Sequence, residues 1–245
     1  MKILFAIGFL AAFAAIGSDS VCVYEQPQFR TATIYAHNSD HRHALFKLTR
    51  TTTRNGNLVD VSREFTSPDG KVVAREHLTY NGNNLVSYDL DDLQSHDKGS
   101  AKVVRDGSET KTVFEYQKGA KHKTDSENFS ADMVTADMIN PFLVSHWDQL
   151  MSGQAVKCRY IVISRAETVG FEFTKEFETT ARGMPVVVVK MAPSSMIIAA
   201  LVDPLIFTIE KNGQHRVLNY DGRTQPKIKK DDKLKDLDAV TVFDW

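Results

Sequence analysis

Dipeptides that favour tight turns punctuate the first half of the chain. Asn55-Gly56, Asp69-Gly70, Asn81-Gly82, Asp106-Gly107 and Lys118-Gly119 recur about every dozen residues, with a double interval between the third and the fourth. Asn-Gly and Asp-Gly suit two-residue hairpins because both residues tolerate positive φ. The spacing therefore predicts a series of antiparallel hairpins.

The segments between these turns alternate apolar and polar residues. Phe46 and Leu48 alternate with Leu45, Lys47 and Thr49, and Val59, Val61 and Phe65 alternate with polar residues in the next segment. A period of two places one set of side chains on each face of a strand. The pattern predicts a meander of long antiparallel strands with one wetter face.

The second half of the chain has a different pattern. Residues 155–164 (AVKCRYIVIS) and 184–191 (MPVVVVKM) are apolar on both faces, which is typical of strands covered on both sides. Residues 205–211 and 215–221 flank Asn212-Gly213 and predict another hairpin.

A helix is predicted within residues 139–153 (INPFLVSHWDQLMSG). Asn140 suits the N-cap, Pro141 suits the first helical position, where its missing N–H costs nothing, and Gly153 suits the end. On such a helix His146 and Asp148 lie about 160° apart, which excludes a catalytic dyad within this stretch. We expect His146 to be satisfied by backbone or water, with Trp147 turned inward.

A second short helix is predicted within SSMIIAALVDP, residues 194–204. Ser195 offers an N-cap oxygen and Pro204 stops the helix. Because this segment is apolar all round, we expect it to be buried. No repeat, low-complexity segment or linker divides the chain, so residues 21–245 are predicted to form a single β-rich domain.

Residues 1–20 have the pattern of a secretory signal peptide. Met1-Lys2 precedes an apolar run that ends at Gly17, and polar residues follow. The run is too short for a stable membrane span, although a retained anchor is the alternative. The mature protein is expected in the periplasm or outside the cell, without a membrane span.

The two cysteines, Cys22 and Cys158, both follow this segment. In an oxidising compartment they are predicted to form one disulfide, worth roughly 4 to 5 kcal/mol in the entropic model. The alternative is two free thiols, with Cys158 acting as a small buried hydrophobic residue.

The charge balance and the missing motifs exclude several functions. Lys and Arg number 30 against 31 Asp and Glu, so we expect no nucleic-acid partner. No Gly-x-Ser-x-Gly elbow, His-Glu-x-x-His motif, zinc-finger cysteine spacing or phosphate loop occurs. The sequence therefore names no catalytic residue and no cofactor, and favours a protein that is not an enzyme.

Three histidines, His37, His41 and His43, lie close to Asp40. His41 and His43 would share a face of a strand and could chelate zinc or copper with a third ligand. A solvated connection between strands is the alternative that we favour, because no further ligand completes a tetrahedron, and we assign no metal site.

The order of these elements resembles the periplasmic lipoprotein-carrier superfamily. The run MAPSSMIIAALVDPLIFTIEKNGQHRVLNYDGRTQPK, residues 191–227, is similar to the last third of uncharacterised bacterial secreted proteins of that shape. The resemblance implies an incomplete β-barrel, formed by a curled antiparallel meander, with two short helices on its concave face and room for an apolar cavity. It carries over no catalytic or ligand residue.

The resulting hypothesis is a non-enzymatic protein of the cell envelope that binds an apolar or amphipathic, lipid-like ligand. The alternatives are an envelope enzyme with a dispersed site near His146, and a structural or assembly factor that binds a protein partner through sheet edges. A set of large apolar residues could line the ligand cavity or could simply fill a core. These residues are Phe142, Trp147, Met151, Phe171, Phe173, Met191, Met196 and Ile197.

Overall fold

The computed structural model describes residues 22–25, 29–200 and 202–245. The predicted signal peptide, residues 1–20, lies outside the described residues and stays a prediction. None of the helices formed by the described residues has the length and apolar character needed to cross a membrane.

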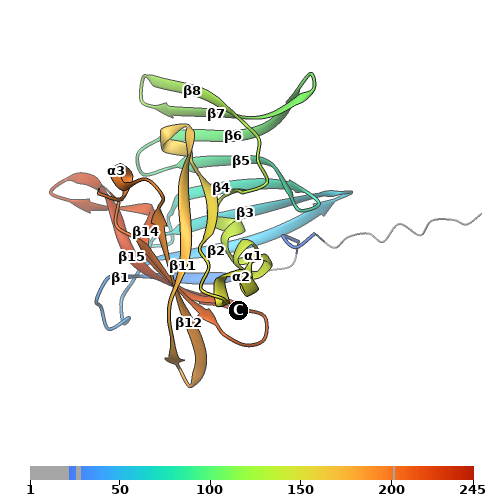
Figure 1. Ribbon diagram of the computed structural model, residues 1–245. Coiled ribbons are helices and arrows are strands. Elements are labelled where there is room, and N and C mark those ends of the chain that lie inside the picture. Colours follow the sequence, from blue (N-terminus) through green and yellow to red (C-terminus); the bar gives the residue numbers. More distant parts are fainter. Residues whose placement is uncertain (1–21, 26–28, 201) are drawn as a thin grey trace, which may run out of the picture.

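The described residues form one 15-stranded sheet that curls on itself, as the turn signals and the alternation predict (Figure 1). Across the sheet, the hydrogen-bonded strands follow the order β8-β7-β6-β5-β4-β3-β2-β1-β15-β14-β13-β12-β11-β10-β9. All pairs are antiparallel except β9 with β10. The strands are β1 (Thr31–Ala36), β2 (Ala44–Asn55), β3 (Leu58–Thr66), β4 (Val72–Asn81), β5 (Asn84–Asp92), β6 (Asp97–Asp106), β7 (Glu109–Lys118), β8 (Lys121–Asn128), β9 (Met133–Val134), β10 (Val156–Val162), β11 (Glu167–Ala181), β12 (Met184–Pro193), β13 (Leu205–Glu210), β14 (Val217–Lys230) and β15 (Lys233–Asp244).

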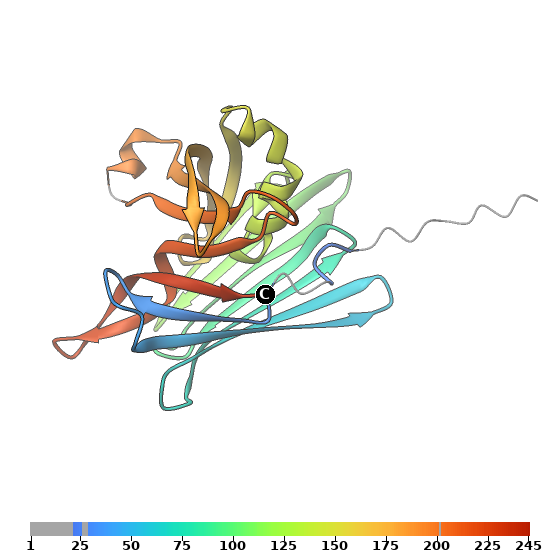
Figure 2. The same cartoon turned by 90° about the horizontal axis from the view of Figure 1, so that it is seen from below.

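Two meanders make up this sheet, and the two ends of the chain join them. Strands β1 to β8 follow one another, strands β10 to β15 do the same, and β1 pairs with β15 from Thr31↔Asp244 to Ala36↔Ala239. Glycines of the predicted turns adopt positive φ, for example +61° at Gly56 and +58° at Gly82, which confirms the hairpins. Asn55 and Asn81 end their strands without positive φ, so each glycine is the first loop residue rather than the second. Seen from below, β10 to β13 stand over the long first strands (Figure 2).

The helical segment inside the curled sheet is broken into short pieces, which corrects the single predicted helix. The pieces are a 3-10 turn, η1 (Ala136–Met138), and two helices, α1 (Ile139–Ser145) and α2 (Trp147–Met151). The chain leaves helical geometry at His146, with φ −113° and ψ 19°. Asn140 is not the N-cap, because α1 begins one residue earlier and Met138 takes that position. The Oδ1 of Asn140 instead accepts a hydrogen bond from the backbone N–H of Val217 on β14, at 2.8 Å.

The second predicted helix is also shorter and more exposed than expected. It spans only α3 (Met196–Ala199), and Ser195 makes no side-chain capping bond. A single turn cannot bury all its faces, so Met196 and Ile197 are 89% and 79% exposed. Ile198 is the residue of this turn that packs against the core.

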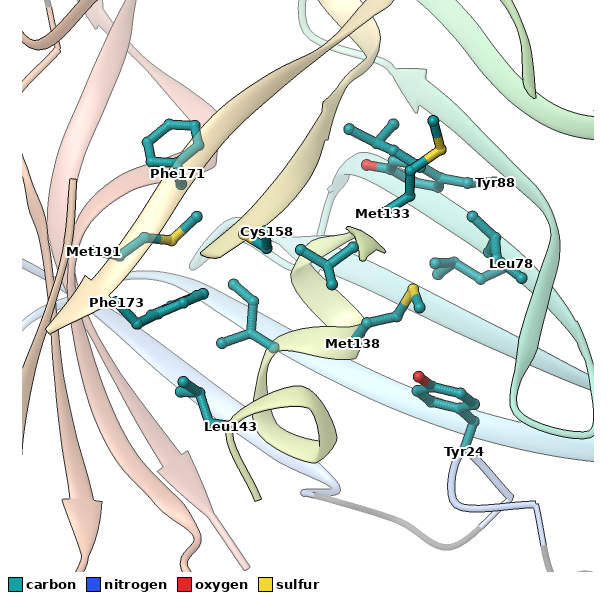
Figure 3. Packing of buried hydrophobic residues seen from close by; sticks show 14 of the residues in the cluster. Tyr24, Leu78, Tyr88, Met133, Met138, Leu143, Cys158, Phe171, Phe173 and Met191 are labelled. Atoms are coloured by element: carbon teal, nitrogen blue, oxygen red, sulfur yellow. The ribbon is translucent and has the colours of Figure 1, made fainter. Parts of the chain in front are cut away.

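Two clusters of buried apolar side chains hold the sheet together. The larger lies around α1 and α2, and the smaller lies around Phe29, Ile34 and Phe65 near the β1–β15 junction. Figure 3 shows Met138 and Leu143 of the helical segment between side chains of the first meander, such as Leu78, and side chains of the second, such as Phe173. The helical segment therefore bridges the two halves of the sheet.

A side-chain bridge links β8 to β10 and β11, near the two ends of the sheet. The Glu127 carboxylate on β8 accepts hydrogen bonds from the backbone N–H and the hydroxyl of Thr168 on β11, at 2.8 and 2.6 Å. Arg159 of β10 donates to the same carboxylate. Side chains rather than a backbone ladder therefore hold β8 against the second meander.

The predicted disulfide is wrong, because Cys22 and Cys158 are both buried and free. The thiol of Cys22 donates to the carbonyl of Gly82 in the β4–β5 turn, at 2.7 Å. Cys158 lies in β10 opposite Phe171, and burial raises the pKa of its thiol to about 12.

We expect neither thiol to react in the folded protein. Iodoacetamide at neutral pH should leave the native protein unlabelled and should add two groups after unfolding in urea without any reductant, because each thiol is enclosed and intact. Intact-mass spectrometry reads both states. A protein that accepts label only after reduction would contain the disulfide and would contradict the fold around Cys22.

Removing the Glu127 bridge should open this junction. Glu127→Ala should lower the free energy of unfolding by about 1 to 3 kcal/mol, measured by urea denaturation, because it leaves the Thr168 amide and the Arg159 guanidinium without their acceptor. Glu176→Ala is the matched control, since Glu176 makes a solvent-exposed ion pair with Lys190 on the same second meander. Equal urea midpoints for the two variants would show that the bridge contributes nothing to the stability of the fold.

Candidate ligand-binding site

Charged residues occupy inward positions on three neighbouring strands. Arg50 of β2 lies opposite Arg63 of β3, and Arg63 lies opposite Glu76 of β4. All three are at least nine-tenths buried. Each lies two residues from Leu48, Val61 or Leu78 on its strand and therefore shares the inward face with it. The alternation of the strands itself thus places two arginines and one glutamate in the interior.

Asp137 supplies the second negative charge of this row. It belongs to η1, and its carboxylate accepts from Nε and Nη2 of Arg50, at 2.7 and 3.1 Å, and from the hydroxyl of Tyr80, at 3.1 Å. Burial alone would raise the pKa of the Asp137 carboxyl, but the charge and hydrogen bonds of Arg50 outweigh burial and hold the pKa below its usual value. Asp137 therefore anchors the helical segment to β2 and β4.

Arg63 and Glu76 form the other ion pair of the row. Nη1 of Arg63 donates to Oε2 of Glu76 at 2.5 Å, and the hydroxyl of Tyr88 donates to Oε1 at 3.0 Å. The guanidinium also lies 5.8 Å from the ring centre of Phe65. Burial raises the pKa of Glu76 in spite of the opposing effect of Arg63. The two pairs together cancel their charges, and we call Arg50, Arg63, Glu76 and Asp137 the buried charge row.

A cavity of about 640 Å³ adjoins this row. Its wall includes Ile34 and Phe65 of the smaller apolar cluster and Phe171 and Phe207 of the larger one, so the cavity lies between the two clusters. Further apolar wall residues are Phe29, Leu48, Leu90, Ile139, Ile161, Val162, Ile163, Val169, Ile198, Val202, Leu205, Val217, Phe243 and Trp245.

A second polar group lies on the cavity wall where β14 meets the turn between β5 and β6. The backbone N–H of Lys227 donates to the side chain of Gln94 at 2.7 Å, and the Gln94 amide donates back to the Lys227 carbonyl at 2.8 Å. The Lys227 ammonium contacts Asp92 at 2.5 Å and Asp97 at 3.7 Å. This clamp joins residues that are more than a hundred positions apart in the sequence.

The structure separates the apolar residues predicted to line a cavity. Phe171 lies on the cavity wall. Phe173 and Met191 are fully buried in the larger cluster, and Met196 and Ile197 are exposed on α3. Phe142, Trp147 and Met151 are partly buried against the larger cluster.

Trp147 is a packing residue in this arrangement. Its ring stacks on His215, with ring centres 4.0 Å apart and 18° between the planes. His146 points its Nδ1 to the carbonyl of Phe142 at 2.8 Å, as expected for a histidine satisfied by backbone. Neither residue lies on the cavity wall.

The three histidines near Asp40 do not gather around one point. His37 binds Asp221 at 3.0 Å, and His41 stacks on Tyr35 with ring centres 4.6 Å apart. In the part of the chain that the structure describes, no group of three His, Cys, Asp or Glu side chains could hold a metal ion.

The sequence analysis overlooked the buried charge row, although the alternation contained its signal. Val59, Val61 and Phe65 define the inward phase of β3, and Arg63 falls in that phase. Glu76 likewise falls in phase with Leu78 on β4. A charged residue at an inward position needs a partner in the interior, and an opposite charge in phase on the next strand indicates an ion pair.

Comparisons with known proteins give one distant structural likeness. No protein-family model matches the chain, and no curated protein matches it significantly. Among solved structures, the chain is similar to the crystal structure of a beta-barrel-like protein of the domain of unknown function DUF1849 from Brucella abortus, at 9% sequence identity and a TM-score of 0.38, over 87% of this chain and 94% of that chain. Likeness at this level assigns neither a family nor a function.

Loss of the Asp137 charge should strongly destabilise the protein. Asp137→Asn keeps the shape of the side chain but leaves Arg50 buried without a counter-charge, which should cost about 3 to 5 kcal/mol at pH 7. Urea denaturation measures this cost. Asp106→Asn is the control, because Asp106 pairs with Lys111 in solvent, and its unfolding midpoint should barely change.

The same variant should change the acid dependence of stability. The folded pKa of Asp137 is lowered, so its carboxylate contributes stability above the unfolded pKa of about 3.9 and loses it as the pH falls towards the folded pKa. The free energy of unfolding should therefore change less with pH across this range for Asp137→Asn than for the wild type. Parallel pH profiles would contradict the assigned role of Asp137.

Proposed function

We propose that the protein binds an amphipathic, lipid-like molecule in the cavity, as a non-enzymatic carrier or binding protein of the periplasm or the extracellular space. The cavity is the observation that carries this proposal. Its volume of about 640 Å³ falls within the range of about 300 to 1,000 Å³ typical of small-molecule sites. Its wall combines large apolar side chains with charged residues that are mostly paired with one another, and the apolar part is typical of such sites.

Two further observations support the proposal. The order of strands and helices resembles the periplasmic lipoprotein-carrier superfamily, whose curled sheet also holds helices on its concave face. The apolar run in residues 1–20 has the pattern of a secretory signal peptide. These two observations support the compartment and the class of ligand, whereas the cavity supports binding itself.

The alternative functions find less support among the described residues. His146 lies between α1 and α2 with its Nδ1 on the carbonyl of Phe142, and it does not line the cavity, so it offers no base there. The sheet edge at β8 is exposed along most of its length and has the sequence KHKTDSEN. Charged side chains on an edge strand oppose pairing with another chain.

A fluorescent apolar probe tests the proposal. N-phenyl-1-naphthylamine should bind one site per chain with an increase in fluorescence. Val162→Trp should weaken this binding by about tenfold or more, because Val162 lines the cavity and the larger ring takes up its space.

Val144→Trp provides the matched control. Val144 is exposed on α1 and does not line the cavity, so this variant should bind the probe as the wild type does. Thermal unfolding shows whether each variant is folded. Lack of binding by the wild type, or equal binding by the two variants, would refute the proposal.

A further inference from the structure

Every carboxylate on the cavity wall, within the described part of the chain, already has a cationic partner. Glu76 pairs with Arg63, and Asp137 pairs with Arg50. Lys227 serves both Asp92 and Asp97, and Arg223 binds Asp236 at 2.8 Å. The deepest pairs, those of the buried charge row, cancel one to one.

This pairing disfavours a charged group inside the cavity. A ligand anion would either remain uncompensated or have to share Arg63 with Glu76, which would place two buried negative charges on one guanidinium. At the buried charge row, a ligand cation would likewise have to share Glu76 or Asp137 with the arginine that already binds it. The two remaining cations of the wall, Lys118 and Arg165, are exposed at its rim, where solvent screens their charge.

Besides the amides and hydroxyls of Asn140, Ser164, Thr224, Gln225 and Thr241, the wall carries four tyrosine hydroxyls. One of these four tyrosines differs from the rest. Tyr88 donates to Glu76, Tyr116 donates to Asp97, and Tyr220 donates to the backbone carbonyl of Arg223. The fourth, Tyr160, also lines the cavity, and its hydroxyl has no hydrogen-bond partner among the described residues. Nε of Arg63 is unpaired and fully enclosed, whereas the unpaired hydroxyl of Tyr160 is not fully enclosed.

The surroundings of Tyr160 favour a donor role for its hydroxyl. The residue lies in β10 opposite Val169, and its ring packs edge-on against Phe171 with ring centres 5.9 Å apart. Burial raises the pKa of the Tyr160 hydroxyl and Glu76 raises it further, whereas Arg63 lowers it. The hydroxyl therefore stays protonated at physiological pH and can donate to an oxygen atom of a bound molecule.

We propose that Tyr160 donates a hydrogen bond to an uncharged oxygen of the ligand, so that the cavity takes neutral amphiphiles such as acylglycerols or fatty alcohols in preference to fatty-acid anions. This inference rests on the proposed function and names its ligand class. The ligand oxygen supplies the acceptor that the protein does not, and the apolar chain lies against the wall between the two clusters.

Displacement of N-phenyl-1-naphthylamine at mildly alkaline pH tests the ligand class. Monopalmitoylglycerol and palmitate carry the same acyl chain, and palmitate is ionised under these conditions. Monopalmitoylglycerol should bind the wild type at least about tenfold more tightly than palmitate. Equal or tighter binding of palmitate would overturn the preference for neutral ligands.

The role of Tyr160 is tested by Tyr160→Phe with Tyr35→Phe as the matched control. Tyr35 is half-buried outside the cavity and stacks on His41. Tyr160→Phe should weaken monopalmitoylglycerol binding about three- to tenfold and should leave binding of the naphthylamine probe, which has no oxygen, unchanged. Tyr35→Phe should change neither.

These experiments distinguish a wrong ligand class from a wrong proposed function. Unchanged monopalmitoylglycerol binding by Tyr160→Phe would remove Tyr160 from the site. Loss of probe binding and of thermal stability in this variant would assign Tyr160 a structural role instead. If the wild type bound the probe but neither lipid, the ligand class would be wrong while the cavity stood; if it did not bind the probe, the proposed function would fall and this inference with it.

Discussion

The buried charge row fixes the interior of this protein. Arg50, Arg63 and Glu76 face inward on adjacent strands, which leaves one positive charge in excess inside the sheet. Burial of an unpaired charge costs several kcal/mol, and Asp137 removes the imbalance by binding Arg50. Because Asp137 belongs to η1, the electrostatic requirement of the sheet also determines where the helical segment lies. The remaining space between the two apolar clusters is the cavity.

Local patterns predicted the sheet well, whereas long-range partners were beyond their reach. Turn dipeptides and alternation gave the meander, since both depend on neighbouring residues. Asn140 has the composition of an N-cap, but an amide of β14, 77 residues away, takes its side chain. Cys22 similarly finds the carbonyl of Gly82 rather than Cys158. Such choices depend on which strands meet in space, and the sequence pattern does not contain that information.

The candidate site was only partly predictable for the same reason. Large apolar residues were the natural choice for a cavity wall, but Phe173 and Met191 are fully buried in the larger cluster and Met196 and Ile197 are exposed. Phe171 lies on the wall, two residues before Phe173 on the same face of β11. Whether an apolar side chain fills a core or borders a cavity depends on what packs against it from other strands. The polar part of the wall, in contrast, was readable from charged residues in the inward phase.

The central feature of this protein is a cavity bordered by paired charges, and we propose that it holds a neutral amphiphile. Native mass spectrometry of the protein purified from its own host, followed by lipid extraction, tests this claim most directly. We predict one bound molecule per chain, released into organic solvent and identified as an uncharged lipid with an ester, amide or hydroxyl group. A protein that carries no ligand and takes up no added lipid, or one that carries a stoichiometric anionic lipid, would contradict the account.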